Sequence, residues 1–386
     1  MRGTVRQRSA GSTWTYQFAI DVGGKRRQIT KGGFRTKRDA QAALSEALAA
    51  WGKGDRRAAA QPSTQALSAY LADWLEARRP GLKPSTVSSY RTTIDSWIVP
   101  HLGHIALRDL TGAHLTRWHG LLRDRGGRGG KPLGTRSVQL AHRVLAMALD
   151  EAVEGGLLHR SPVLEVPKKQ RPTHKARQVG SRVWSAAEAQ LFLVAIDGDR
   201  LHPLYALALD TGMRRGELAG LRWSDVDLDA ARLSVQRNRV LVGGQPVEGT
   251  PKSGEGRSVD LDAGTVAVLR RWRSQQLQER MKWGPAWIDS GYVFTREDGE
   301  PLHPEHITSR FESLTRAAPL PVIRLHDLRH TSATIALAAG VHPKVVQERL
   351  GHADISITLD LYSHVTPGMG AEAAAKIGAA LYGVTA

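Results

Sequence analysis

Apolar and polar residues alternate over residues 14–22, in the stretch WTYQFAIDV. A period of two predicts a strand with one buried face. A Gly–Gly pair follows and predicts a turn into a second strand over residues 25–31, and residues 4–9 could add a third. Thr36 is then a suitable N-cap for a helix that runs to about Trp51. Residues 1–55 are therefore predicted to form a small α+β module, a three-stranded sheet plus one helix.

Helical spacing dominates the next hundred residues. Residues 52–62 have no apolar period and predict a linker. Apolar residues then recur three and four positions apart, for example after Ser85 and after Thr111, and a longer apolar stripe stops at Gly155–Gly156. An all-α domain is expected over 63–165. Its tryptophans fall on the apolar stripes, which favours core positions over nucleic-acid stacking.

The pattern becomes mixed beyond residue 180. Residues 161–182 carry prolines and basic clusters but few apolar residues, which predicts an extended basic connector. Helical patterns precede residue 212, strand-like alternation covers 232–242 and 256–262, and helical spacing then resumes. Residues 180–386 are therefore expected to form a helix-rich α+β domain. A short helix over 372–382 could pack on its own chain or on a neighbouring copy, and the sequence leaves both open.

Positive charge is in large excess and is unevenly placed. Lys and Arg number 54 against 37 Asp and Glu, a formal net charge of +17. Residues 1–60 alone hold 13 Lys and Arg against 4 Asp and Glu, so the first module is a basic arm. Such a balance predicts a polyanionic partner. No signal peptide, lipidation signal or long apolar run favours a membrane instead, so we expect a cytoplasmic protein.

The chain contains no cysteine. Disulfides, cysteine-ligated zinc and thiol nucleophiles are thereby excluded together. Any covalent chemistry must use Ser, Thr, Lys, Tyr or a carboxylate.

Four short segments after residue 210 place polar groups among apolar neighbours. Taken singly, each group has an ordinary structural explanation, such as a helix salt bridge, a solvated turn or a packed tyrosine. Together they supply two guanidiniums, two imidazoles, one ammonium and one phenol. The segments are TGMRRGEL (211–218) with Arg214 and Glu217, TPKSGEGRSV (250–259) with Lys252 at a predicted hairpin tip, LHDLRHT (325–331) with His326 and Arg329 at the start of a helix, and LGHADISITLDLYSHV (350–365) with His352 and Tyr362.

This set of groups fits nucleophilic attack on a DNA phosphodiester. Arg214 and Arg329 could clamp the two non-bridging oxygens bidentately. His326 and His352 could donate hydrogen bonds to the same oxygens. Because fixed cations would supply the electrostatic stabilisation, no metal and no cofactor is required.

Tyr362 is the candidate nucleophile. A phenol has a pKa of about 10 and attacks poorly until it loses its proton in a positive pocket. Lys252 could protonate the leaving 5′ oxygen as a general acid. Four other tyrosines lack neighbouring cations in the sequence, namely Tyr90, Tyr205, Tyr292 and Tyr382.

The motifs TGMRRGEL, HDLRH and LGH with a tyrosine ten residues later resemble the tyrosine recombinase family, and more narrowly its phage-type, lambda integrase-like members. The resemblance implies an arm-site DNA-binding module, a helical core-binding domain and a catalytic domain, in that order. It also implies a role for each candidate residue. Arg214 would be the first catalytic arginine, supported by Glu217, Lys252 the hairpin lysine, His326 and Arg329 the histidine-x-x-arginine pair, His352 the second histidine, and Tyr362 the nucleophile. Arg215 adjoins Arg214, but the TG-x-R spacing favours Arg214.

The activity implied by the resemblance is site-specific recombination through a 3′-phosphotyrosine, which integrates or excises a mobile element. The implied partners are double-stranded DNA at core and arm attachment sites, a homotetramer on DNA, and accessory DNA-bending or directionality factors. A type IB topoisomerase and a non-catalytic DNA-binding regulator are the alternatives. A metal-dependent nuclease would require clustered carboxylates, and none accompany these histidines.

Overall fold

The computed structural model describes residues 3–7, 13–22, 25–52, 63–172, 182–251, 256–352, 354–356, 358–359, 378–379 and 381. The chain divides into two compact units, residues 1–176 and 177–386. Lys252 and Tyr362, and most of the segment 372–382, lie outside the described residues. No helix in the described part of the chain is long and apolar enough to cross a bilayer.

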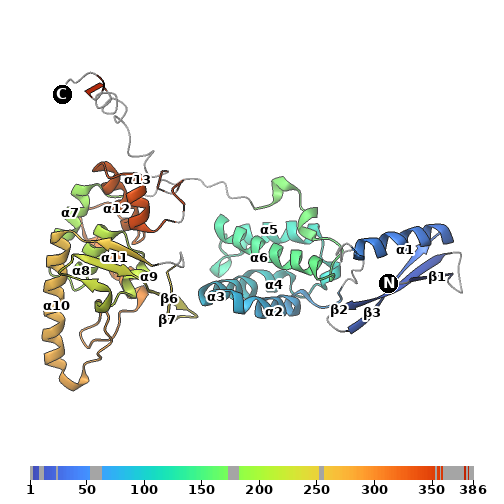
Figure 1. Cartoon of the computed structure of the whole chain (residues 1–386), viewed down its shortest axis with the longest axis horizontal. Helices are drawn as coiled ribbons and strands as arrows, with labels where there is room; N and C mark the ends of the chain where they lie inside the picture. Colours follow the sequence, from blue (N-terminus) through green and yellow to red (C-terminus); the bar gives the residue numbers. More distant parts are fainter. Residues whose placement is uncertain are drawn as a thin grey trace. The chain divides into compact units, whose positions relative to one another are not determined.

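The N-terminal module is a three-stranded antiparallel sheet with one helix against it (Figure 1). The alternating stretch forms the central strand, and its Tyr16 and Phe18 are buried against Leu44 of the helix. Thr36 caps this helix by accepting from Asp39 N at 3.1 Å. The predicted α+β module is therefore confirmed. Its elements are β1 (Gly3–Gln7), β2 (Trp14–Val22), β3 (Lys25–Phe34) and α1 (Lys37–Gly52).

The second region is all-helical around an apolar core. Trp74 and Trp118 are buried, as their positions on the apolar stripes predict. Each donates its indole N–H inside the domain, Trp118 to Trp97 O at 2.7 Å. Thr111 begins one helix with a capping box. The helices are α2 (Leu67–Arg78), α3 (Pro84–Thr93), α4 (Val99–Leu102), α5 (Gly112–Arg125) and α6 (Thr135–Glu154), with a π-helical turn at Ile94–Ile98.

The prediction of an extended connector over 161–182 is wrong for its first part. Residues Pro162–Glu165 and Lys168–Gln170 form 3₁₀ turns. Val163 and Val166 are buried in the helical core, and Arg171 Nε donates to Val166 O at 2.9 Å. Two well-placed valines are enough to anchor this short segment to the bundle. Residues 173–181 lie outside the described part.

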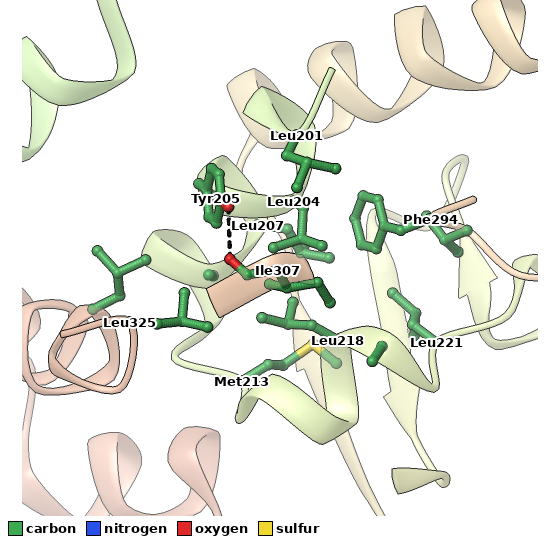
Figure 2. Packing of buried hydrophobic residues seen from close by; sticks show 14 of the residues in the cluster. Leu201, Leu204, Tyr205, Leu207, Met213, Leu218, Leu221, Phe294, Ile307 and Leu325 are labelled. Atoms are coloured by element: carbon green, nitrogen blue, oxygen red, sulfur yellow. Dashed lines mark hydrogen bonds between the residues drawn. The ribbon is translucent and has the colours of Figure 1, made fainter. Parts of the chain in front are cut away.

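The C-terminal unit packs helices against α8 (His202–Thr211), and its described strands form two small antiparallel sheets. Figure 2 shows leucines of α8 packed beside Met213, Leu218 and Phe294, with Tyr205 Oη donating to Ile307 O at 2.9 Å. The other helices are α7 (Ala186–Ala195), α9 (Arg215–Ala219), α10 (Ala263–Trp283), α11 (Pro304–Ala317), α12 (Asp327–Ala338) and α13 (Pro343–Leu350). The strands are β4 (Val226–Asp227), β5 (Arg232–Val235), β6 (Asn238–Val242), β7 (Gln245–Gly249) and β8 (Arg257–Asp260).

The strands of this unit differ from the prediction in two ways. The single strand expected over 232–242 is divided, because Arg237 turns to form an ion pair with Asp225 and the chain leaves the sheet there. β5 then pairs with β8, whereas β6 pairs with the unpredicted β7. β7 and β8 belong to separate sheets, and Lys252 between them lies outside the described residues, so its place at a hairpin tip stays a prediction.

Candidate active site

A left-handed glycine places the first arginine. Gly212 ends α8 with φ of 61°. A Cβ at this position would lie 2.2 Å from Leu350 Cδ2, so both the backbone conformation and the space require glycine. The chain then reverses into α9, with Arg214 as its N-cap residue.

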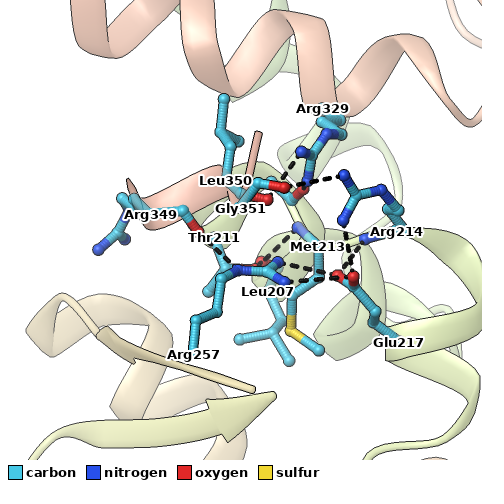
Figure 3. Close-up of polar contacts among 11 residues, drawn as sticks. Leu207, Thr211, Met213, Arg214, Glu217, Arg257, Arg329, Arg349, Leu350 and Gly351 are labelled. Carbon is cyan, nitrogen blue, oxygen red and sulfur yellow. Dashed lines mark hydrogen bonds and ion pairs between the residues drawn. The ribbon is translucent and has the colours of Figure 1, made fainter. Parts of the chain in front are cut away.

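Arg214 and Glu217 form a reciprocal cap at the start of α9 (Figure 3). Glu217 Oε2 accepts from Arg214 N, and Oε1 accepts from Arg214 Nη1, each at 2.9 Å. Arg214 Nη2 donates to Gly351 O at 3.1 Å, which links α9 to the residue after α13. The side chain remains 25% exposed, so one side of its guanidinium is accessible to a ligand.

Arg329 is the more deeply placed arginine. It lies in the first turn of α12, is only 4% exposed, and donates from Nη1 to Gly212 O and from Nη2 to Leu350 O, both at 2.7 Å. Burial, together with the neighbouring charge of Arg214, lowers the pKa of Arg329 to about 9. The guanidinium therefore stays charged at neutral pH.

Arg257 completes the cluster, and the sequence reasoning missed it. It is the first residue of β8, and its Nη1 and Nη2 donate to the two oxygens of Glu217 at 3.2 and 2.8 Å. A sequence signal did exist, because Arg257 is two residues from the buried Val259 on the same strand. Alternation therefore places this charge on the inward face of the sheet.

Glu217 is a buried carboxylate, 1% exposed, that joins two arginines. Burial alone would raise the pKa of Glu217, but the hydrogen bonds and charge of Arg257, and then those of Arg214, lower it overall. Glu217 is therefore ionised at neutral pH. Three guanidiniums around one carboxylate leave an excess of positive charge, which suits an anionic ligand.

The two candidate histidines both interact electrostatically with Arg329. His326 is the exposed N-cap residue of α12, with its ring 5.3 Å from that of His330. Desolvation, the neighbouring His330 and Arg329 lower the pKa of His326. His352 is half-buried, and its Nδ1 lies 2.9 Å from Thr358 Oγ1. Burial, then Arg329 and Arg214, lower the pKa of His352 to about 3. Both imidazoles are therefore neutral at pH 7 in this state.

The structure thus gathers Arg214, Glu217 and Arg329 at one turn. Glu217 and Gly351 O accept from Arg214, the adjacent Leu350 O accepts from Arg329, and His352 follows the same turn. Arg215 points elsewhere, because its Nη1 donates to Thr308 Oγ1 on α11 at 3.0 Å. The geometry therefore favours Arg214 over its neighbour, as the TG-x-R spacing does.

Tyr292 has cations nearby, although the sequence predicted none for it. The guanidinium carbons of Arg222 and Arg239 lie 4.8 and 5.3 Å from the ring centroid of Tyr292. Tyr292 itself is 7% exposed, and its arginines bind Glu248 and Leu302 O. These cations pack against the ring, so the arrangement is typical of a structural cation–π contact.

Within the described ranges, no three His, Cys, Asp or Glu side chains are grouped as a metal-ligand set. The chemistry available to the cluster is electrostatic. It can hold an anion beside one accessible guanidinium and two neutral imidazoles.

Comparison with known proteins assigns the chain to a protein family. Residues 187–369 match the Phage integrase family, residues 5–50 an Arm DNA-binding domain, and residues 66–122 the N-terminal SAM-like domain of phage integrases. The chain belongs to the phage integrase family. It is therefore a tyrosine recombinase, an enzyme of the class that cleaves and rejoins DNA, and the resemblance predicted from the motifs is confirmed.

Named relatives agree with this assignment. A tyrosine recombinase XerC-like protein of Caldanaerobacter subterraneus subsp. tengcongensis is 28% identical over 314 residues, covering 76% of this chain and 78% of the relative. The ICEBs1 integrase of Bacillus subtilis is 26% identical over 298 residues, again covering 76% and 78%.

Solved structures show the same fold. The Tn1549 transposon integrase in complex with transposon right end DNA superposes with a TM-score of 0.67 at 19% identity, covering 81% of this chain and 99% of that one. A lambda integrase dimer bound to a core site gives a TM-score of 0.57 at 20% identity, covering 93% and 94%. The predicted multidomain architecture is thereby confirmed.

Proposed function

We propose that this protein integrates or excises a mobile element by site-specific recombination, with Tyr362 forming a 3′-phosphotyrosine link to DNA. The observation that carries the proposal is the cluster in which Glu217 and main-chain carbonyls hold Arg214 and Arg329 side by side. Such a cluster, in a chain of the phage integrase family, is suited to binding a scissile phosphate.

The two arginines would bind and neutralise the non-bridging oxygens of that phosphate. A guanidinium carries five N–H donors, and the intramolecular bonds described above use two from the side chain of each arginine. Arg214 is the more exposed of the two and would make the outer contacts. Arg329, held deep in the protein, would stabilise the charge that develops in the transition state.

The histidines would act as neutral hydrogen-bond donors. Each neutral imidazole carries one N–H. In His352, Nδ1 faces the hydroxyl of Thr358, so Nε2 is the atom left for the substrate. Burial, and then the charges of Arg329 and Arg214, lower the pKa of His352, and a bound phosphate would offset those charges and raise the pKa toward its ordinary value.

The covalent step would exchange one phosphoester for another. The phenolic oxygen of Tyr362 attacks the phosphorus after losing its proton, the bond from phosphorus to the 5′ oxygen breaks, and Lys252 protonates the leaving oxygen. A 5′ hydroxyl from a partner duplex later attacks the phosphotyrosine and releases Tyr362. Because the bond energy stays in the protein–DNA link, no nucleotide cofactor is consumed.

The proposed partner is double-stranded DNA, bound by the arm module at arm sites and by the other two domains at core sites. A solved structure of lambda integrase holds a tetramer on a Holliday junction. We propose the same stoichiometry for this chain during strand exchange, assisted by DNA-bending or directionality factors. The net charge of +17 supports such a polyanionic partner.

The test is trapping of the covalent intermediate. The substrates are nicked duplex oligonucleotides tiled across the DNA that flanks the gene. Cleavage of such a duplex releases a short strand with a 5′ hydroxyl. Because that hydroxyl diffuses away, it cannot reverse the reaction, and the covalent adduct accumulates. We expect a protein–DNA adduct on denaturing gels with the wild type and none with Tyr362→Phe, which should still bind DNA. Tyr292→Phe is the matched control, and should form the adduct at the wild-type rate.

Three results would contradict the proposal in different ways. An undiminished adduct with Tyr362→Phe would exclude this nucleophile. DNA binding by the wild type without any adduct would indicate a non-catalytic regulator. Relaxation of supercoiled DNA without exchange between two duplexes would indicate a topoisomerase.

A further inference from the structure

Arg257 belongs to the cluster, but its side chain is directed inward. It is 11% exposed, so very little of its side chain is available to a DNA backbone. Its two η nitrogens donate to both oxygens of Glu217, and its Nε donates to Arg349 O at 2.9 Å. All three guanidinium nitrogens therefore have acceptors inside the protein.

The C-terminal turn of α13 supplies a row of acceptors for this arginine and its two neighbours. Three successive carbonyls accept from three arginines that lie on three different elements. The last carbonyls of a helix have no partner within the helix and carry the negative end of its dipole, so they suit cations. The pairs are Arg257 Nε to Arg349 O at 2.9 Å, Arg329 Nη2 to Leu350 O at 2.7 Å, and Arg214 Nη2 to Gly351 O at 3.1 Å.

We propose that Arg257 is a positioning residue for Arg214, acting through Glu217. Arg257 fixes the Glu217 carboxylate, and that carboxylate together with the α13 turn fixes the guanidinium that would bind the scissile phosphate. This role rests on the recombinase function proposed above, and adds a residue that does not itself contact DNA.

The bonding of Glu217 explains why its position depends on Arg257. Each carboxylate oxygen accepts one bond from Arg214 and one from Arg257. Without Arg257, a buried carboxylate loses half of these donors, and it is free to rotate toward any remaining one. Arg214 would then lose the fixed acceptor that orients its Nη1.

Lysine should replace Arg257 only in part. A guanidinium binds both oxygens of a carboxylate with a planar fork, whereas an ammonium acts as a point charge. A lysine at this position can keep the charge beside Glu217 but cannot also reproduce the bidentate bond and the bond to Arg349 O. If Arg257 acts by positioning Glu217, the rate of adduct formation in Arg257→Lys should lie between those of the wild type and Arg257→Gln. If only its charge matters, Arg257→Lys should react like the wild type.

The experiment compares single-turnover adduct formation on the nicked duplex that the wild type cleaves. The variants are Arg257→Gln, Arg257→Lys, Glu217→Gln and the double Glu217→Gln/Arg257→Gln. We expect Arg257→Gln to lower the rate on the order of 10- to 100-fold while the dissociation constant for DNA changes less than about threefold. Arg257→Lys should be intermediate. The double variant should be no slower than the slower single variant, because both act through one carboxylate.

Arg232→Gln is the matched control. Arg232 lies on β5, the strand paired with β8, and forms an exposed ion pair with Asp260. Arg232 lies in the same sheet as Arg257 but outside the arginine cluster. Arg232→Gln should therefore form the adduct at the wild-type rate.

Several outcomes would overturn the assignment of Arg257. They are a wild-type rate in Arg257→Gln, single-variant effects that multiply in the double variant, or a loss of DNA affinity that parallels the loss of rate. Thermal unfolding reports whether Arg257→Gln folds, and if it does not, a wild-type rate in Arg257→Lys overturns the role instead. Failure of the underlying function is distinguishable, because the wild type itself would then form no adduct, or Tyr362→Phe would form one.

Discussion

The helical domain and the arginine cluster of the C-terminal unit both bury large side chains, with opposite chemistry. The interior of the helical domain is built from fully buried leucines and tryptophans, such as Leu145 and Trp118. The cluster instead buries Glu217 and Arg329, at 1% and 4% exposure. Apolar burial is favourable in itself, whereas burial of charge is costly unless each donor and acceptor is satisfied.

The comparison separates stability from chemistry. A protein can bury charge at a net cost where the charge is needed for a reaction. We therefore expect core variants of the helical domain to change unfolding, and cluster variants to change the cleavage rate. The predictions below test this separation, beginning with the largest effect.

Trp118→Ala should cause the largest loss of stability. It removes a side chain that is 1% exposed and leaves Trp97 O without its 2.7 Å donor. The expected cost is about 3–5 kcal/mol. Hydrogen exchange should show faster opening of α5 and α6 peptides, with unchanged peptides from α8 and α12. An equal loss of protection from exchange in the helical domain and in the C-terminal unit would contradict the separation of stability from chemistry.

Arg329→Gln should mainly affect chemistry. It removes a charge from the cluster and weakens two bonds to main-chain carbonyls. We expect adduct formation to slow by about 10² to 10³-fold, the typical effect of losing a transition-state donor. Adduct assays measure this rate, and hydrogen exchange of the helical domain serves as the control. A variant that cleaves at the wild-type rate would remove Arg329 from the proposed mechanism.

Acid should lower the stability of the helical domain through protonation of His119. We expect this to be the smallest of the three effects. His119 is 1% exposed, and its Nε2 lies 3.1 Å from His142 Nδ1. Burial, then the nearby His142 and Arg123, lower the pKa of His119 to about 4. The unfolded chain, with an ordinary pKa of about 6.5, therefore binds more protons below that pH. Stability is fully present above pH 6.5 and falls as the pH decreases toward 4.

This acid effect amounts to about 2 kcal/mol between pH 7 and pH 5. Burial, and then the charge of Arg171, lower the pKa of His142 as well, so His142 adds to the loss in the same direction. Hydrogen exchange of α5 and α6, corrected for the intrinsic pH dependence of exchange, measures the loss. His119→Gln should show less of it, and an equal loss in that variant would assign the acid sensitivity elsewhere.

Much of the fold could be predicted because it depends on local patterns. The period of two over 14–22 and the cap at Thr111 each specify their element without reference to the rest of the chain. The division of strand 232–242 could not be predicted, since it depends on an ion pair between Arg237 and Asp225 and on a change of sheet. The valines that anchor residues 162–170 were too few to form a period.

The candidate site was predictable only where a side chain carries the chemistry. Arg214, Glu217 and Arg329 stand out in the sequence as charges among apolar residues. The acceptors that hold them do not, because Leu350 O and Gly351 O are main-chain atoms that every residue possesses. Lys252 and Tyr362 lie outside the described residues, so their roles stay predictions.

The row of carbonyls at the C-terminal turn of α13 has a consequence for shortened copies of the chain. Leu350 O is one of the two acceptors of Arg329, and Gly351 O is one of the acceptors of Arg214, whereas the arginines themselves come earlier in the chain. A copy that stops before residue 350 would keep both arginines but would lack these two carbonyls, so it would hold the guanidiniums less firmly.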